Sequence, residues 1–411
     1  MDKTLLKIQQ KNIPVSWRVE RFGDVFDFLS TATYSRDILK ESGEVQYLHY
    51  GDIHTKYNFH LDFTKNNLPF ITEIERRNYP YMKNGDLVLA DASEDYDGVG
   101  KGVEIKNLGD SKAISGLHTF LLRDKDSNFV LGYKGFIPSC DVVREQFYRF
   151  ATGTKVYSLS KESLSNVKVL IPPKEEQKAI ADCLSTWDDA IEKQTKLIAA
   201  KEQRKKALMQ QLLSGKKRLP GFEKKWKLHS IEELFIFKNG KAHENVIDEE
   251  GKFILINSKF ISSNSQVVKR TNKNLSPLKI DDLVFVMSDV PKGKALGKFF
   301  YVDKDGLYTL NQRIGLLQIK TGNPKFMYYL LNRNRHFLSF DNGVGQTNLR
   351  KDDILECPLL IPDLDEQNEI ANFISFIDRE YQLELLKLDK LKTQKKGMMQ
   401  KLLTGKIRLI A

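Results

Sequence analysis

Four loops in this sequence contain glycine together with side chains that bind phosphates or base edges. Two lie in the first half, Gly98–Gly102 and the segment TGTKVYS, and two in the second half, VPKGKALGK and GVGQTNLR. Lysine and arginine pair with phosphate oxygens, whereas amide and hydroxyl groups hydrogen-bond to base edges. The candidate nucleic-acid contacts are Lys101, Thr154, Lys155, Tyr157, Lys292, Lys294, Gln346, Asn348 and Arg350. Each loop can equally be an ordinary surface turn, and the Gly-led loops can be structural joints.

The sequence contains no recognisable motif of a common enzyme. The segment VPKGKALGKFF differs from a phosphate-binding loop in its spacing, and Phe299 replaces the required Ser or Thr. The Pro-Pro-aromatic segment of adenine methyltransferases is missing, and the acids of PDLDEQ suit a helix start. His49, His54 and His60 lack the helical spacing of metal ligands, so no metal site is expected. No catalytic residue is predicted, which favours a chain that supplies recognition to a separate enzyme.

The sequence is one unit written twice. The segment IPPKEEQKAIA (Ile171–Ala181) returns 190 residues later as IPDLDEQNEIA (Ile361–Ala371), and KKALMQQLLSGKKRL returns in the same register as KKGMMQKLLTGKIRL. Earlier segments also match, with offsets that loops of unequal length would produce: AISGLHTFLLR resembles YTLNQRIGLLQ, and GDLVLA resembles DDLVFV. A repeat of this size predicts one architecture used twice, with surfaces that have diverged.

The composition favours a polyanionic partner. The 411 residues carry a net charge of +11, with no basic low-complexity tail, so nucleic acid is the first candidate. Three scattered cysteines suit a reducing compartment. The N-terminus lacks a hydrophobic signal core, and no apolar run reaches membrane-spanning length. We expect a soluble cytoplasmic protein that has no contact with a membrane.

Each copy is predicted to end in a helix of about forty residues. Prolines precede it at Pro172–Pro173 and Pro362, and Gly215 and Gly405 stand where a C-terminal cap belongs. Apolar residues follow a heptad pattern between these limits, which is typical of helices that pack on each other. The predicted packing residues are Ile180, Leu184, Trp187, Ile191, Ile198, Leu208, Ile370, Ile374, Ile377, Tyr381, Leu388, Leu391 and Met398.

The predicted fold class is α+β, with two similar globular domains joined by two long helices packed as an antiparallel coiled coil. Antiparallel packing would relate the copies by a pseudo-two-fold axis, the kind of symmetry that duplex DNA also has. Short apolar runs such as GDLVLA alternate with turn clusters in each globular half. The predicted domains are residues 1–172, helix 173–215, residues 216–361 and helix 362–411.

The chain resembles the specificity subunit of type I restriction–modification systems. The resemblance covers nearly the whole chain and lies in the two helix starts, IPP…EEQ…IA and IPD…DEQ…IA, the helix ends LMQQLLSGKKRLPGF and MMQKLLTGKIRL, and the segments beginning at Trp17 and Trp226. It implies two target-recognition domains that each read one half of a split, asymmetric DNA site. The helices would act as a ruler across the unspecified gap.

The resemblance also implies partners for a non-catalytic chain. Two modification subunits would methylate adenine at N6 with S-adenosylmethionine, and two restriction subunits using ATP can join them. These cofactors and Mg²⁺ are expected on the partner subunits, and none on this chain. A coiled-coil scaffold that does not read DNA and a DNA-acting enzyme with an unrecognised active site are the alternatives. The residues do not reveal the target sequence or the gap length.

Overall fold

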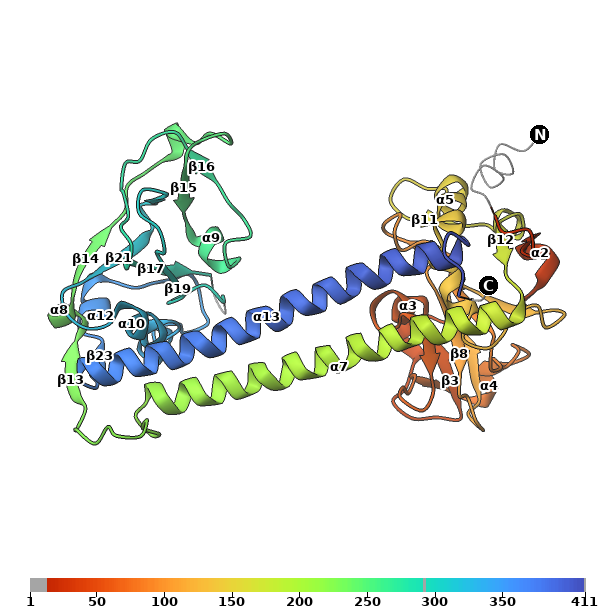
Figure 1. Ribbon diagram of the computed structural model, residues 1–411, viewed down its shortest axis with the longest axis horizontal. Coiled ribbons are helices and arrows are strands. Elements are labelled where there is room, and N and C mark those ends of the chain that lie inside the picture. The colour runs from red at the N-terminus through yellow and green to blue at the C-terminus, as the bar shows by residue number, and fades with distance from the viewer. Residues whose placement is uncertain (1–12, 291–292, 410–411) are drawn as a thin grey trace. The chain divides into compact units, whose positions relative to one another are not determined.

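The computed structural model describes residues 13–290 and 293–409, which form two compact units (Figure 1). Unit 1 comprises the chain up to Thr195 together with the segment from Lys387 onward. Unit 2 runs from Lys196 to Leu386. Each unit therefore contains one globular half and parts of both long helices.

Unit 1 is built on a five-stranded sheet of order β2-β10-β6-β8-β4 and a three-stranded sheet of order β5-β3-β9. Two short ribbons, β1-β12 and β7-β11, complete it. The strands are β1 (Arg18–Arg21), β2 (Phe26–Leu29), β3 (Val45–Leu48), β4 (Phe59–Asp62), β5 (Phe70–Ile71), β6 (Leu87–Ala90), β7 (Ala92–Ser93), β8 (Gly102–Lys106), β9 (Ala113–Ser115), β10 (Thr119–Asp124), β11 (Tyr157–Ser158) and β12 (Lys168–Ile171).

Unit 2 repeats this plan with a four-stranded sheet of order β14-β21-β17-β19, a three-stranded sheet of order β16-β15-β20 and the ribbons β13-β23 and β18-β22. The strands are β13 (Lys227–Ser230), β14 (Phe235–Asn239), β15 (Phe253–Ile256), β16 (Arg270–Thr271), β17 (Leu283–Val286), β18 (Ser288–Asp289), β19 (Phe299–Tyr301), β20 (Tyr308–Leu310), β21 (Ile314–Ile319), β22 (Thr347–Asn348) and β23 (Pro358–Ile361).

The two units share strand order and strand direction. The β3–β9 pair and its counterpart β15–β20 are both parallel, an unusual feature that the repeat preserves. The central strands β6 and β17 are buried at every residue, which explains their continuous apolar sequences LVLA and LVFV. Unit 1 has an additional edge strand, β4, which pairs with β8. The prediction of two similar α+β halves is confirmed.

Short helices connect these strands. In unit 1 they are α2 (Phe22–Val25), η1 (Arg36–Ile38), α3 (Tyr50–Thr55), α4 (Glu73–Arg76), η2 (Lys134–Ser139), α5 (Asp141–Phe150) and α6 (Lys161–Ser165). In unit 2 they are α8 (Ile231–Leu234), η3 (Glu244–Val246), α9 (Ser258–Ser262), α10 (Pro324–Leu331), α11 (Arg335–Leu338) and α12 (Lys351–Leu355).

The long helices are α7 (Lys174–Leu213) and α13 (Leu364–Leu403), each of 40 residues. α7 begins directly after Pro173 and α13 begins two residues after Pro362, and each has two acidic side chains in the first turn that suit the positive end of a helix dipole. Both end at the predicted glycines, Gly215 and Gly405, which have left-handed φ angles of 69° and 70°. The N–H groups of Lys217 and Ile407 return to carbonyl groups of the last helical turn.

The two helices run antiparallel within each unit. In unit 1, Asp188 of α7 pairs with Lys395 of α13. In unit 2, Lys201 of α7 contacts Glu384 at 2.8 Å, and Lys205 contacts Asp378, so a later residue of α7 meets an earlier residue of α13. Lys201, Lys205 and Lys395, which occupy polar positions of the heptad stripe, thus pair with acids of the facing helix. The antiparallel coiled coil predicted from the heptads is confirmed.

The residues of the predicted stripe lie along this interface at different depths. Ile180, Leu184, Ile198, Ile370 and Ile374 are buried. The remainder are half-buried: Trp187, Ile191, Leu208, Ile377, Tyr381, Leu388, Leu391 and Met398. Ile180, Leu184, Ile370 and Ile374 are buried most completely, because they also pack into the cores of the globular halves.

Motif residues shared by the copies meet at one junction in each unit. Buried Glu176, at the start of α7, accepts hydrogen bonds from the Trp17 indole and from Arg408, which follows the end of α13. In unit 2, Glu366 at the start of α13 accepts from Trp226 and from Arg218, which follows the end of α7. Each copy therefore supplies the arginine that neutralises the buried glutamate at the start of the other copy's long helix.

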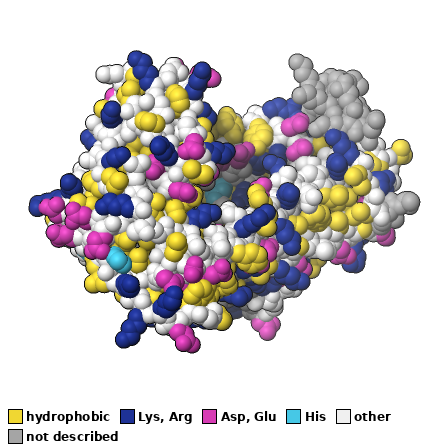
Figure 2. Space-filling model, turned by 60° about the vertical axis from the view of Figure 1, so that its left-hand side comes forward, with side chains coloured by type: hydrophobic (Ala, Val, Ile, Leu, Met, Phe, Trp, Pro, Cys, Tyr) yellow, Lys and Arg dark blue, Asp and Glu magenta, His cyan; other side chains and the backbone are white. Residues whose placement is uncertain are grey.

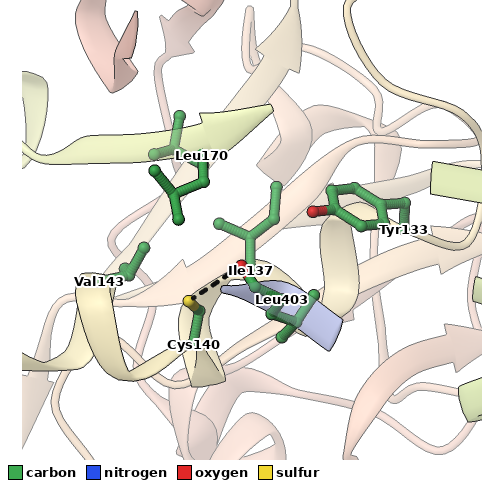
Figure 3. Close-up of a pocket in the computed structure, with 7 residues that line it drawn as sticks. Tyr133, Ile137, Cys140, Val143, Leu170 and Leu403 are labelled. Atoms are coloured by element: carbon green, nitrogen blue, oxygen red, sulfur yellow. Dashed lines mark hydrogen bonds between the residues drawn. The ribbon is translucent and has the colours of Figure 1, made fainter. Parts of the chain in front are cut away.

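The end of α13 is part of the core of unit 1. Figure 3 shows Leu403 lining a small apolar pocket together with Tyr133, Ile137, Val143 and Leu170. The Cys140 thiol points at the carbonyl group of Leu403, 3.7 Å away. Leu402 and Met399 are buried in the same cluster. The C-terminal helix is thereby fixed to the globular half formed by the first copy.

Within the described residues, 13–290 and 293–409, no helix is both long and apolar enough to cross a bilayer.

Candidate nucleic-acid interface

In unit 1, two of the predicted loops are joined by a short ribbon. Ala92 and Ser93 of β7 pair with Ser158 and Tyr157 of β11, which places the loop before Lys101 beside the TGTKVYS loop. The first loop is held tightly, because Asp95 accepts the N–H of Gly98 and a Cβ on Gly98 would lie 2.1 Å from the Ser93 hydroxyl oxygen. The ribbon therefore presents both loops at one edge of the unit.

Unit 2 contains the same ribbon with different side chains. Ser288 and Asp289 of β18 pair with Asn348 and Thr347 of β22, which joins the VPKGKALGK loop to the GVGQTNLR loop. The Asp289 carboxylate accepts the N–H groups of Val290, Ala295 and Leu296, and a Cβ on Gly293 would lie 2.1 Å from it. An acid–glycine contact thus shapes this loop, as a serine–glycine contact does in unit 1.

Lys101 has an equivalent in unit 2 that the sequence alignment did not identify. Its ammonium group donates to the His54 carbonyl oxygen at 2.9 Å, at the end of α3. Lys298 donates to the Ser262 carbonyl oxygen of α9, also at 2.9 Å. Burial lowers the pKa of both lysines. The two lysines tie the loop to a short helix, and Lys101 is only half exposed.

The other predicted residues of unit 1 reach solvent. Thr154 and Lys155 are exposed, and Tyr157 is half-buried. The Tyr157 ring lies 3.8 Å from the Tyr96 ring, centroid to centroid. Tyr96 is 46% exposed, so this aromatic pair has a free surface beside the two loops. Aromatic and basic groups together suit contact with a nucleic-acid backbone or an unstacked base.

The predicted residues of unit 2 are also accessible. Lys294, Gln346, Asn348 and Arg350 are exposed. The Gln346 amide donates to the Asn348 carbonyl oxygen at 3.2 Å, so these two amides act as a pair. Lys292 lies outside the described residues.

The structure adds residues that sequence reasoning missed. An open cleft in unit 2 is lined by Gln346 and Asn348 together with Ser288, Gln312 and Arg313. Gln312 and Arg313 are exposed in the turn between β20 and β21. The alignment of AISGLHTFLLR with YTLNQRIGLLQ could have indicated these two residues, because the apolar strand positions match and the turn residues differ.

The three histidines of the segment HYGDIHTKYNFH are each bonded to the backbone. The His49 ring accepts the Gly51 N–H, His54 lies 2.9 Å from the Ala92 carbonyl oxygen, and His60 lies 2.9 Å from the Gly132 carbonyl oxygen. In the part of the chain that the structure describes, no group of three or more His, Cys, Asp or Glu side chains is arranged to hold a metal ion.

Basic side chains are dispersed over the surface. Figure 2 shows Lys and Arg scattered across the visible face, with acidic side chains between them. A net charge of +11 distributed in this way attracts a polyanion over a broad area.

Two modules with one framework, each presenting loops rich in groups that bind phosphates and base edges, define a protein that reads DNA sequence. A family model described as the type I restriction modification DNA specificity domain matches residues 14–201 and again residues 223–393. The matches cover most of the chain, so the chain belongs to this family. Its function is DNA sequence recognition, and the family is a non-catalytic one.

Individual relatives agree with the family model. The type I restriction enzyme MjaVIII specificity subunit of Methanocaldococcus jannaschii is 25% identical over 291 residues, which are 65% of this chain and 68% of that protein. The putative MjaX specificity subunit of the same organism is 22% identical and covers 99% of this chain and 97% of its own length.

Solved structures share the fold. The type I restriction-modification S subunit of M. genitalium has a TM-score of 0.54 and 16% identity, covering 95% of this chain and 96% of that one. A chain from a study of complex assembly in a type I restriction–modification system has a TM-score of 0.64 and 14% identity, covering 96% and 100%.

Proposed function

We propose that this chain is the DNA sequence-recognition subunit of a type I restriction–modification enzyme and that it reads a bipartite, asymmetric site. The observation that carries the proposal is the pairing of one framework with two different sets of loop side chains. Unit 1 and unit 2 share strand order, yet the ribbon residues Ala92 and Ser158 of one correspond to Ser288 and Asn348 of the other. Two units that share a strand framework but differ in their loop side chains read two half-sites of different sequence.

The proposal includes partner subunits that perform the chemistry in the cytoplasm. Two modification subunits would methylate adenine N6 with S-adenosylmethionine, and two restriction subunits with ATP and Mg²⁺ can join. An apolar surface supports a protein partner: Phe373, Phe376, Leu383 and Leu386 of α13 are 38–65% exposed. Their spacing of three and seven residues forms a second stripe, which differs from the stripe that faces α7. Exposed apolar stripes on helices are typical of interaction sites.

The partner surface is tested by co-purification with the modification subunit. Phe376→Ser should weaken complex formation because it removes the most exposed side chain of the stripe, whereas Lys392→Ser, an exposed polar position on the same helix, should not. Equal complex formation by both variants would contradict this surface.

The function itself is tested by expressing the chain with its modification subunit in a methylation-free bacterial host and mapping N6-methyladenine across the genome. A bipartite motif with a constant gap is expected. A contiguous motif, or methylation at scattered sites, would count against the proposal. A scaffold that does not read DNA would leave the methylation pattern independent of this chain.

A further inference from the structure

The cleft of unit 2 is formed by three separate segments of the chain. Ser288 lies on β18, Asn348 lies opposite it on β22 and Gln346 precedes that strand. Gln312 and Arg313 come from the turn before β21. Five side chains that can hydrogen-bond thus converge on one hollow, with buried Leu349 beneath them.

The backbone around this cleft is the same in both units. The N–H of Leu349 bonds to the Met287 carbonyl oxygen at 2.8 Å, and the N–H of Leu159 bonds to the Asp91 carbonyl oxygen at 2.9 Å. Gly297 and Gly100 both have left-handed φ angles, 62° and 71°. These contacts establish a residue-by-residue equivalence between the two surfaces.

The five polar side chains lining the cleft all differ across that equivalence, whereas Leu349 corresponds to Leu159. The strand registers align Ser288 with Ala92 and Asn348 with Ser158, and two residues before the latter pair Gln346 aligns with Val156. Ile314 pairs with Val286 as Thr119 pairs with Ala90, so the preceding residues also correspond: Arg313 with His118 and Gln312 with Leu117. The framework is retained and every polar group of the cleft is replaced, which is the pattern expected where specificity is encoded.

The chemistry of the cleft suits purine edges in the major groove. Among the described residues, the Arg313 guanidinium has no hydrogen-bond or ion-pair partner, so its donors are free. Arginine makes two hydrogen bonds to guanine O6 and N7, and asparagine or glutamine makes two to adenine N6 and N7. The hydrogen bond between Gln346 and Asn348 leaves donors and an acceptor of the amide pair available.

We propose that this cleft is the base-reading site of unit 2, with Arg313 reading a guanine and the Gln346–Asn348 pair reading an adenine. The inference rests on the proposed function and assigns residues within it. The corresponding surface of unit 1 reads a different half-site because His118 replaces Arg313. His118 there lies 3.1 Å from the Asp91 carboxylate, a pairing that unit 2 cannot form because Met287 occupies the equivalent position.

The test compares complexes of the modification subunit with the wild-type chain, Arg313→His or Gln346→Val, the two substitutions that install the unit 1 residue. Binding is measured on duplexes that carry the wild-type methylation motif and on duplexes with each base changed in turn. Each variant should lose roughly ten- to a hundredfold of discrimination at one position of one half-site. Discrimination in the other half-site should be unchanged.

Lys304→Ala is the control because it removes an exposed positive charge at the opposite end of the β17–β19 pair. It should leave discrimination at every position unchanged. A uniform loss of affinity for all duplexes in Arg313→His, with a shallower salt dependence, would show a phosphate contact and overturn the assignment. Unchanged discrimination in both cleft variants would overturn it as well. A wild-type complex without any bipartite motif would instead refute the proposed function.

Discussion

At the scale of single residues, the strongest motif of the repeat has a structural explanation. The second glutamate of EEQ, Glu176, and the glutamate of DEQ, Glu366, are both buried. Each accepts hydrogen bonds from an arginine of the other copy and from a tryptophan indole. The next residue, Gln177 or Gln367, caps the proline carbonyl group before its helix and binds a backbone N–H of the globular half. These residues are alike in both copies because they hold each long helix to its neighbours.

Removing one partner of this buried pair should destabilise unit 2. Arg218→Ala leaves the Glu366 carboxylate, whose side chain is 1% exposed, with the Trp226 indole as its main remaining partner. We expect a loss of about 2–4 kcal/mol in unfolding free energy, since a buried charge without its counter-ion is costly. Urea denaturation of the full chain measures it.

The matched control is Lys224→Ala. Lys224 pairs with Asp363 at 2.8 Å near the same helix start, but its side chain is 81% exposed. Such exposed surface pairs contribute little to stability. If both variants lost the same small amount of stability, the proposed structural role of the junction would be wrong.

A second residue-scale prediction concerns pH. Burial lowers the pKa of His60 to about 4, below its value of about 6.5 in an unfolded chain. The contribution of neutral His60 to stability is therefore fully present above pH 6.5 and is lost as pH falls toward 4. His60→Gln, which stays neutral, should lose about 2–3 kcal/mol less than wild type between pH 7 and pH 4.5. Equal losses of unfolding free energy in wild type and His60→Gln would contradict the prediction that burial lowers the pKa of His60.

At the scale of elements, the long helices were the most predictable part of the molecule. Proline and glycine set their limits and a heptad pattern set their contact face, all within one continuous segment. The polar residues Lys201, Lys205 and Lys395 that interrupt the stripe pair with acids of the facing helix. Such pairs specify the register between two helices.

The antiparallel register of unit 2 can be tested by exchanging charges. Lys201→Glu should weaken unit 2 because it faces Glu380 and Glu384, whereas Lys201→Glu combined with Glu384→Lys should recover part of the loss. The double-mutant cycle should show coupling, with a combined loss smaller than the sum of the two single losses. Strictly additive effects would show that the two positions are not in contact.

The sequence was less informative about the interface loops. Alignment matched the loop of Lys101 to that of Lys292 and Lys294, but the structural equivalent of Lys101 is Lys298, because the two loops differ in length. Gln312 and Arg313 were missed because the cleft assembles three segments whose proximity depends on strand pairing. Non-local pairing of this kind leaves no local pattern in a single sequence.

At the scale of the whole molecule, duplication followed by divergence explains the reading of an asymmetric site. The shared framework keeps strand order, loop glycines and helix junctions, while Arg313, Gln346 and Asn348 correspond to His118, Val156 and Ser158. The dispersed net charge of +11 adds affinity for any duplex, which salt weakens. Specificity is expected to survive at salt concentrations where this general attraction fails.

The most direct test of this account measures the affinity of one complex, this chain with its modification subunit, for four DNA duplexes at moderate salt. One carries the methylation motif, one has the first half-site scrambled, one has the second scrambled, and one has only the gap scrambled. We predict that scrambling either half lowers affinity at least about a hundredfold, with no effect from the gap. Equal binding of all four duplexes would contradict the claim that this chain reads DNA through two recognition modules.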